Sequence, residues 1–329
     1  MTKYGTSLYG TFLYGVATTV TAATPATGPS IGGAYFELTG TGLDPRQWDD
    51  EFTAPVLNPA LWNDISAGGS ITTGTFHLEL DTTAVAGSTA GVQSVTTWTN
   101  AQGEVRFYIP SVVRYPASDV APMMFVLDVG GGTYAMMSVI IGTSRSDIRL
   151  RCATYIGGVL TDEHVVAWTL GTSLLKILRF NGKILFIANG TVIYTVKSFS
   201  NAAAQFEIYS YNGAAAYQVL STVEYFYFRT FVAFDSEITH NPTVVCDERL
   251  RGYTPASIDT KEISAAYAGL VDIVAVGATT GTLADGYEYY FVDRLRVIND
   301  DQFGIVLSVI DDDQALSPST VAVGLGEGK

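Results

Sequence analysis

Residues 174–199, LLKILRFNGKILFIANGTVIYTVKSF, decide the fold class. Two Asn-Gly pairs, Asn181-Gly182 and Asn189-Gly190, divide this stretch into three apolar runs. Asn-Gly between such runs is the strongest short signal for a two-residue hairpin turn, because both residues of that turn adopt positive φ. The stretch therefore predicts three consecutive antiparallel strands.

The composition of the whole chain agrees with this prediction. Of its 329 residues 47% are hydrophobic and only 15% are charged, and it contains 19 Tyr and 16 Phe. Long helices need more Glu, Lys, Arg, Gln and Leu, whereas β-branched and aromatic residues between Gly, Asn and Asp favour strands. We therefore expect an all-β protein, and its length predicts two or three folded units.

Further apolar runs lie on both sides of the central stretch. FEIYSYN (206–212) and VEYFYFRTF (223–231) follow it, and WDDEFTAPVLNPALWNDIS (48–66) and TFHLEL (75–80) precede it. This order contains an acidic residue followed by Phe, then a Trp, and a closing aromatic strand. It resembles the concanavalin A-like, laminin G-like jelly roll. The resemblance spans about residues 48–235 and implies that Trp62 lies in the core.

The segments that flank this region resemble the two ends of another domain. GPSIGGAYFELTGTGL (28–43) is similar to the opening of the IPT/TIG immunoglobulin-like domain, and residues 251–291 are similar to its last strands. We expect an immunoglobulin-like sandwich, residues 25–47 and 236–292, split by an inserted jelly roll, residues 48–235. Long insertions are tolerated because the entropy of loop closure grows slowly with length. Two independent small units are the alternative.

The two ends of the chain belong to neither of the predicted sandwich domains. Residues 1–24 place Tyr4, Tyr9 and Tyr14 at a five-residue spacing, each followed by Gly, which fits neither a helix nor a strand. We expect an extended arm whose tyrosines anchor the chain in an assembly, with a disordered or locally packed tail as the alternative. Residues 293–329 predict one strand pair and an acidic, Gly-rich tail.

Charge and cysteine content exclude several classes of function. The formal net charge of −14 repels phosphate backbones, so nucleic acid is not an expected partner. No apolar stretch reaches the ~20 residues of a membrane-spanning helix. Cys152 and Cys246 stand far apart, so we expect two reduced, buried thiols and no disulfide scaffold.

The residues predict no catalytic centre. A glycosidase needs two carboxylates across the scissile bond, and laminarinase-like enzymes supply them from one strand as E-x-D-x-x-E or E-x-D-x-E. The single E-x-D is Glu79-Leu80-Asp81, and it is followed by Thr82, Thr83 and Ala84. No Cys/His pair with zinc spacing accompanies the three histidines, His77, His164 and His240. We therefore expect no catalytic residue and no enzyme.

The sequence does not assign any ligand site. We assign no metal site and no cofactor, although the resemblance allows Ca²⁺, with Asp49, Asp50 and Glu51 as candidates by position and Asp311 to Asp313 by density. Solvated charge is the alternative role of such clusters. Sugar-binding residues stay unknown, because the aromatic candidates equally suit core packing; they are Trp98, Trp168, Tyr211 and Tyr217.

This combination of an arm, an immunoglobulin-like domain and a lectin-like sandwich resembles the architecture of bacteriophage virion proteins. The resemblance implies a structural virion protein, such as a capsid decoration, head fibre, tail or baseplate component, made in the host cytoplasm and present in several copies. Its partners would be other virion proteins and host-surface glycans, with no membrane span. The alternatives are a bacterial surface or secreted carbohydrate-binding protein and a cryptic glycoside hydrolase.

Overall fold

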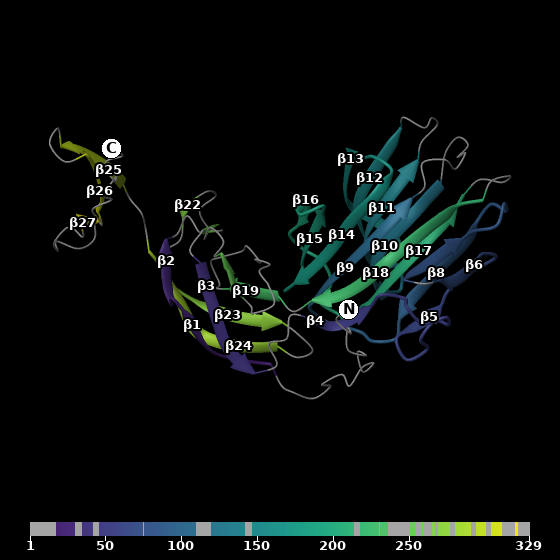
Figure 1. Cartoon of the computed structure of the whole chain (residues 1–329), viewed down its shortest axis with the longest axis horizontal. Helices are drawn as coiled ribbons and strands as arrows, with labels where there is room; N and C mark the ends of the chain where they lie inside the picture. Colours follow the sequence, from purple (N-terminus) through teal and green to yellow (C-terminus); the bar gives the residue numbers. More distant parts are fainter. Residues whose placement is uncertain are drawn as a thin grey trace, which may run out of the picture. The chain divides into compact units, whose positions relative to one another are not determined.

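In the computed structural model, every regular element of the described residues is a β-strand, which confirms the all-β class (Figure 1). Among these residues no helix is long and apolar enough to cross a membrane. The described residues are 18–29, 35–41, 46–74, 76–109, 120–141, 147–213, 218–229, 231–235, 251–253, 258–259, 265–266, 269–276, 280–290, 294–300, 304–310 and 320–321.

The chain divides into two compact units. The first contains residues 46–230, and the second contains residues 13–45 and 231–329. The first unit therefore covers nearly the whole of the region that the sequence predicts to be a jelly roll. The flanking segments on both sides of that region belong to the second unit.

Two large antiparallel sheets build the first unit. One has seven strands in the order β13(Val159–Ala167), β12(Ile148–Ile156), β11(Thr133–Ile141), β10(Val120–Gly130), β17(Gln205–Asn212), β8(Ser88–Ser94), β5(Trp62–Asp64). The other has eight strands, seven of them in the order β16(Thr191–Val196), β15(Lys183–Ala188), β14(Gly171–Phe180), β9(Ala101–Ile109), β18(Leu220–Arg229), β7(His77–Asp81), β6(Ser70–Gly74). The eighth, β4(Arg46–Asp50), pairs with the part of β18 that follows the residues paired with β7.

The inward faces of these sheets share one hydrophobic core. Leu127 and Phe206 of the seven-stranded sheet and Ile177 and Phe226 of the other are all fully buried in it. Alternate residues of each strand point inward, as a two-layer sandwich requires. Trp62 is 1% exposed in the same core, so its predicted place is confirmed. The first unit is a jelly-roll sandwich.

The predicted Asn-Gly hairpins are also confirmed. They join β14 to β15 and β15 to β16, and all four turn residues have positive φ: 45° at Asn181, 73° at Gly182, 48° at Asn189 and 81° at Gly190. This is the backbone geometry that a two-residue hairpin turn requires.

Two smaller sheets build the second unit. One contains β1(Thr19–Thr24), β3(Tyr35–Thr41) and β20(Arg251–Tyr253), and the other contains β19(Phe231–Asp235), β23(Gly269–Val276), β24(Thr280–Tyr290) and β2(Thr27–Pro29). Phe36 and Leu38 from β3 share a core with Val271 from β23 and Tyr287 from β24. Segments on both sides of the jelly roll in sequence thus contribute to one core.

The remaining strands form two small sheets. One pairs β21(Ile258–Asp259) with β22(Ala265–Ala266), and the other orders β25(Arg294–Asp300), β26(Gly304–Ile310) and β27(Thr320–Val321). Several predicted features lie outside the described residues: Tyr4, Tyr9, Tyr14, Tyr217, His240, Cys246 and Asp311 to Asp313. Cys152 is buried as a free thiol, and this burial raises its pKa to about 12.

Candidate functional site

Strand β9 presents a row of polar side chains on the outer face of the eight-stranded sheet. Val105, Phe107 and Ile109 point into the core, so Gln102, Glu104, Arg106 and Tyr108 point to the opposite face. On the core side a Cβ at Gly103 would lie 2.6 Å from the Phe206 ring. The sandwich is thus tightly packed beneath this polar row.

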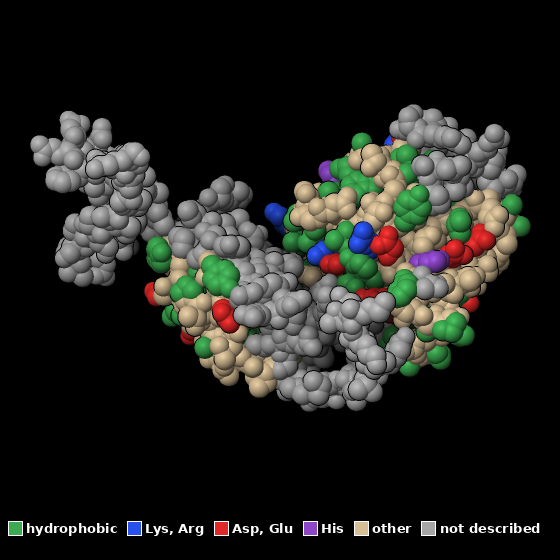
Figure 2. All heavy atoms as spheres, viewed as in Figure 1, with side chains coloured by type: hydrophobic (Ala, Val, Ile, Leu, Met, Phe, Trp, Pro, Cys, Tyr) green, Lys and Arg blue, Asp and Glu red, His purple; other side chains and the backbone are tan. Residues whose placement is uncertain are grey.

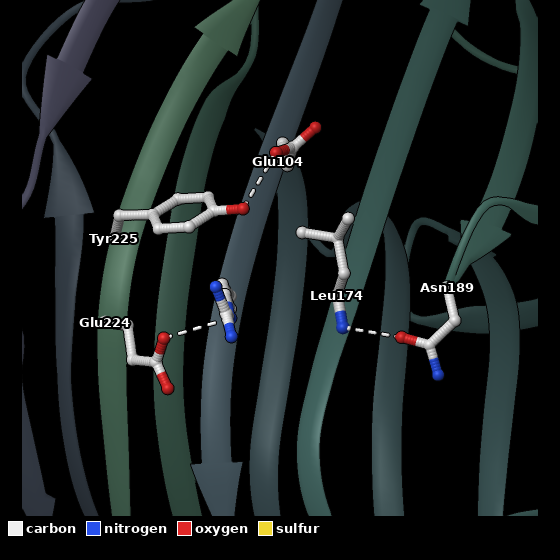
Figure 3. A network of polar contacts seen from close by, with 6 residues as sticks. Glu104, Leu174, Asn189, Glu224 and Tyr225 are labelled. Atoms are coloured by element: carbon white, nitrogen blue, oxygen red, sulfur yellow. Dashed lines mark hydrogen bonds and ion pairs between the residues drawn. The ribbon is translucent and has the colours of Figure 1, made fainter.

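Glu104 is the one acid of this row, and it is buried. Its side chain is 6% exposed, and Lys176 Nζ of β14 lies 2.7 Å from its Oε2. The Tyr225 hydroxyl of β18 donates a hydrogen bond of 3.1 Å to its Oε1, as Figure 3 shows. A buried carboxylate is costly unless it is paired and hydrogen-bonded, and Glu104 meets both conditions.

A β-bulge in β18 places a second glutamate beside this row. Val223 lies opposite Phe107 and Tyr225 lies opposite Arg106, so Glu224 is the extra residue. Its Oε2 lies 2.9 Å from Arg106 Nε (Figure 3). Bulges redirect side chains and occur often next to active sites. Here the bulge brings Glu224 and Tyr225, which are neighbours in sequence, into contact with the same strand.

The Glu79-Leu80-Asp81 segment lies on the same face. Glu79 is opposite Thr222 of β18, which in turn is opposite Tyr108 of β9. Glu79 Oε1 is 3.4 Å from His77 Nε2, and both Asp81 oxygens accept from Gln218 Nε2, at 2.6 and 2.8 Å. Figure 2 shows acidic and basic side chains interspersed on this unit, with a histidine beside a line of acids.

Gln102 adds an unsatisfied polar atom to the face. The residue is 2% exposed, and its Oε1 has no hydrogen-bond partner in the part of the chain that the structure describes. A buried acceptor without a partner costs about 1–3 kcal/mol. Such atoms are rare in folded proteins, and a bound ligand or water commonly accounts for them.

The predicted calcium candidates have other roles in the described structure. Asp50 accepts hydrogen bonds from the Trp62 indole at 2.8 Å and from the Phe52 amide at 2.7 Å, and burial raises its pKa. Glu51 Oε1 accepts from the Tyr227 hydroxyl at 2.9 Å. The side chain of Asp49 lies outside the described residues. Within the described part, no three acidic, histidine or cysteine side chains gather as metal ligands.

The aromatic candidates for sugar binding separate into two groups. Trp98 stacks on Phe228 at 4.7 Å and packs against the core. Trp168 also packs there, with its indole 3.3 Å from Ser173 Oγ. For these two, core packing is the better description. Tyr211 lies on β17 in the seven-stranded sheet and is partly exposed.

None of the sites predicted from sequence includes Glu104, Arg106, Lys176 or Glu224. The alternation Gln-x-Glu-x-Arg-x-Tyr over residues 102–108 was a readable signal, because period two on a strand places these residues on one face. The bulge that redirects Glu224 has no comparable signature. Contacts across three strands also cannot be read from local spacing.

The fold and this face define an all-β jelly-roll protein with clustered acids on one sheet. No family model matches the chain, and a search of curated proteins gave no match. Solved structures with a similar fold include the β-glucanase of Bacillus licheniformis (11% identity, TM-score 0.44, 57% of this chain and 99% of that chain). Others are the laminarinase catalytic domain of Thermotoga maritima (10%, 0.45, 56% and 96%) and an apo Crh5 transglycosylase (13%, 0.45, 57% and 85%).

These findings correct two predictions from sequence. A structural virion protein was expected and an enzyme was not, but the similar solved structures are glucanases, laminarinases and transglycosylases. The comparison with solved structures therefore contradicts the virion prediction and the exclusion of an enzyme, and neither is retained. The sequence prediction considered acids within one strand, whereas this face combines acids of β7, β9 and β18. At 10–13% identity the likeness concerns the fold alone.

Proposed function

We propose that the jelly roll is a glycoside hydrolase domain whose substrate lies across the outer face of the eight-stranded sheet. One observation carries this proposal: Glu104 is buried on that face, held by Lys176 and Tyr225, with a second glutamate, Glu224, on the neighbouring strand. A sandwich needs no buried carboxylate on its outer face, because alternate positions there can remain solvated. A carboxylate that is buried and held in place on such a face is typical of a functional site.

The two glutamates supply the groups that glycoside hydrolysis requires. In this reaction one carboxyl group donates a proton to the leaving oxygen as the bond from C1 to that oxygen breaks. The other attacks C1 or activates water. We assign the second role to Glu104, because two donors hold it in one orientation. We assign proton transfer to Glu224, which is 35% exposed and reaches solvent.

The partly exposed residues around Glu104 suit a sugar chain. Tyr108 is 41% exposed and offers an aromatic surface, while Arg106 and Glu79 offer charged hydrogen-bonding groups. Ligand sites generally combine apolar surface with a few polar groups that fix orientation.

The test is the release of reducing sugar from laminarin and from mixed-linkage β-1,3-1,4-glucan. We expect Glu104→Gln and Glu224→Gln each to lower the rate by about 100-fold or more, as the loss of a general acid, base or nucleophile does. Asp147→Asn is the matched control, since Asp147 is an ion-paired acid elsewhere, 2.6 Å from Arg149. A wild-type protein that binds these glucans and releases no product contradicts the proposal, as does full activity of Glu104→Gln.

We also propose that the second unit is an immunoglobulin-like domain, residues 25–47 and 236–292, that carries the jelly roll as an insertion. The shared core of Phe36, Leu38, Val271 and Tyr287 supports this assignment. So does the alternation of β3, in which Tyr35 and Glu37 are exposed and Phe36 and Leu38 are buried. The Tyr4, Tyr9 and Tyr14 arm lies outside the described residues and stays a prediction.

A further inference from the structure

The outer face of the seven-stranded sheet carries its own apolar cluster. Val126, Met136 and Ala153 lie opposite one another on β10, β11 and β12 and are 2%, 4% and 0% exposed. Their neighbours in sequence, Leu127, Met137 and Cys152, point the other way into the main core. Met124, Tyr134, Tyr155 and Tyr209 pack over the cluster and are themselves partly exposed.

Two of these tyrosines form a stacked aromatic pair. The rings of Tyr134 and Tyr155 stack with centroids 4.6 Å apart and planes 18° from parallel. Arg151 lies over the Tyr155 ring at 5.8 Å and donates to its hydroxyl at 2.8 Å, which fixes the ring in place. An ordered ring pair of this kind costs little further entropy when it binds a ligand.

Glycine turns leave the space beside this pair open. The turns at Gly130–Gly132 and Gly157–Gly158 follow β10 and β12, and the Gly158 amide donates to the Gly132 carbonyl at 2.8 Å. A Cβ at Gly130, Gly131, Gly157 or Gly158 would meet no atom within 4 Å. The described structure therefore places no atom within 4 Å of these four positions, and a ligand can approach the tyrosines from this end.

Acidic and amide groups border the stacked pair of Tyr134 and Tyr155. Asp128 lies opposite Tyr134, and Glu207 lies opposite Val126. Glu207 Oε1 accepts from Gln93 Nε2 at 2.7 Å, and Asp128 Oδ1 accepts from the Gly130 amide at 3.1 Å. Each carboxylate has further lone pairs that can accept from hydroxyl donors. With a net charge of −14, the protein disfavours an anionic ligand here.

We propose that this face is a second, non-catalytic binding surface for a neutral polysaccharide. The apolar C–H face of a pyranose ring would lie against Met124 and the exposed edges of the stacked Tyr134 and Tyr155 rings, and its hydroxyls would donate to Asp128 and Glu207. The surface lies on the sheet opposite to the one that carries Glu104. It would hold a polymeric chain to the domain whether or not the Glu104 face hydrolyses it.

Methionine methyl NMR of the full chain tests this proposal directly. Met124 and Met136 belong to the outer cluster, whereas Met123 and Met137, one residue away from each, lie in the main core. In Glu104→Gln, which keeps the probe intact, titration with laminarihexaose or cellohexaose should shift the Met124 and Met136 methyl signals. The Met123 and Met137 signals should stay within the line width, as internal controls.

Other outcomes overturn the proposal separately from the proposed hydrolase. Binding seen by calorimetry with all four methyl signals unmoved places the ligand elsewhere, as on the Glu104 face. No binding of either probe or of their parent polysaccharides also rejects the surface. Equal shifts of all four signals would indicate a global change.

A variant pair gives an independent check. Tyr134→Ala/Tyr155→Ala should weaken polysaccharide binding at least tenfold, whereas Tyr134→Phe/Tyr155→Phe, which keeps the stacked rings, should retain most of it. Tyr290→Ala is the control, since Tyr290 is an exposed tyrosine of the second unit. Unchanged binding by the alanine pair, with the fold intact by near-ultraviolet circular dichroism, contradicts the proposal.

Discussion

At the scale of single residues, Asp50 links a surface strand to the core. It is the last residue of β4, and its two oxygens accept from the Trp62 indole and the Phe52 amide. Phe52 itself has a φ of 49°, a conformation that non-glycine residues adopt rarely, and the Asp50 bond stabilises it. One carboxylate thus fixes both the turn and the position of the largest core side chain.

We expect Asp50→Ala to lower the free energy of unfolding by about 2–3 kcal/mol, because it leaves the buried indole N–H without its acceptor. Asp50→Asn keeps one acceptor oxygen and should cost about half as much. Urea denaturation of the three proteins measures this. Equal stability of all three would show that solvent replaces the carboxylate.

The same residue predicts a pH dependence. Burial raises the pKa of Asp50 in the folded protein above its value in the unfolded chain. The unfolded chain therefore loses this proton first as pH rises, so the contribution of Asp50 is fully present below about pH 4 and falls as pH rises through the folded pKa. Relative to Asp50→Asn, the wild type should lose stability as pH rises above about 4. A wild type that instead gains stability over the variant as pH rises contradicts this.

At the scale of elements, the two Asn-Gly hairpins differ in their surroundings. A Cβ at Gly182 would lie 2.8 Å from the Phe199 carbonyl oxygen, and the Phe199 amide donates to the Gly182 carbonyl at 2.6 Å. A Cβ at Gly190 would meet nothing within 4 Å. Both glycines have positive φ, so the hairpins form a matched pair.

We predict that Gly190→Ala costs about 1 kcal/mol of stability, from backbone strain alone. Gly182→Ala should cost about 2–3 kcal/mol, because the methyl group also displaces the 199 backbone. Thermal unfolding of both variants tests the ranking. Equal losses would show that the turn near Phe199 relaxes without cost.

The bulge in β18 is the element that most affects the candidate site. Regular pairing would point Glu224 and Tyr225 to opposite faces, as period two dictates. The extra residue lets Glu224 contact Arg106 while Tyr225 contacts Glu104. The site therefore depends on a local irregularity within a long, otherwise regular strand.

At the scale of the whole molecule, the two units have separate cores. The core of residues 46–230 and the core around Phe36 and Tyr287 share no residue. We therefore expect two unfolding transitions by calorimetry. A chain of residues 46–230 alone should keep one of them at nearly the same midpoint, because a unit with its own core folds independently. A single transition that vanishes in the shortened chain would mean that the units fold as one.

The amino-acid sequence was enough to predict the all-β class, both Asn-Gly hairpins, the jelly roll and the buried position of Trp62. These features depend on local chemistry: positive φ at Asn-Gly, the period of two along a strand, and the preference of aromatic residues for a core. The hairpins can be recognised within a window of about ten residues, whereas the jelly roll and the place of Trp62 were inferred from a resemblance that spans residues 48–235.

The grouping of acids on the outer face of the eight-stranded sheet depends on the tertiary structure. Glu79, Glu104 and Glu224 are separated by 25 and 120 positions in the sequence, and strand pairing places them on one face. The same holds for Tyr134 and Tyr155, which stack because β11 pairs with β12 in one particular register. Register follows from the burial of a whole face rather than from the residues that it brings together, so local patterns do not reveal such contacts.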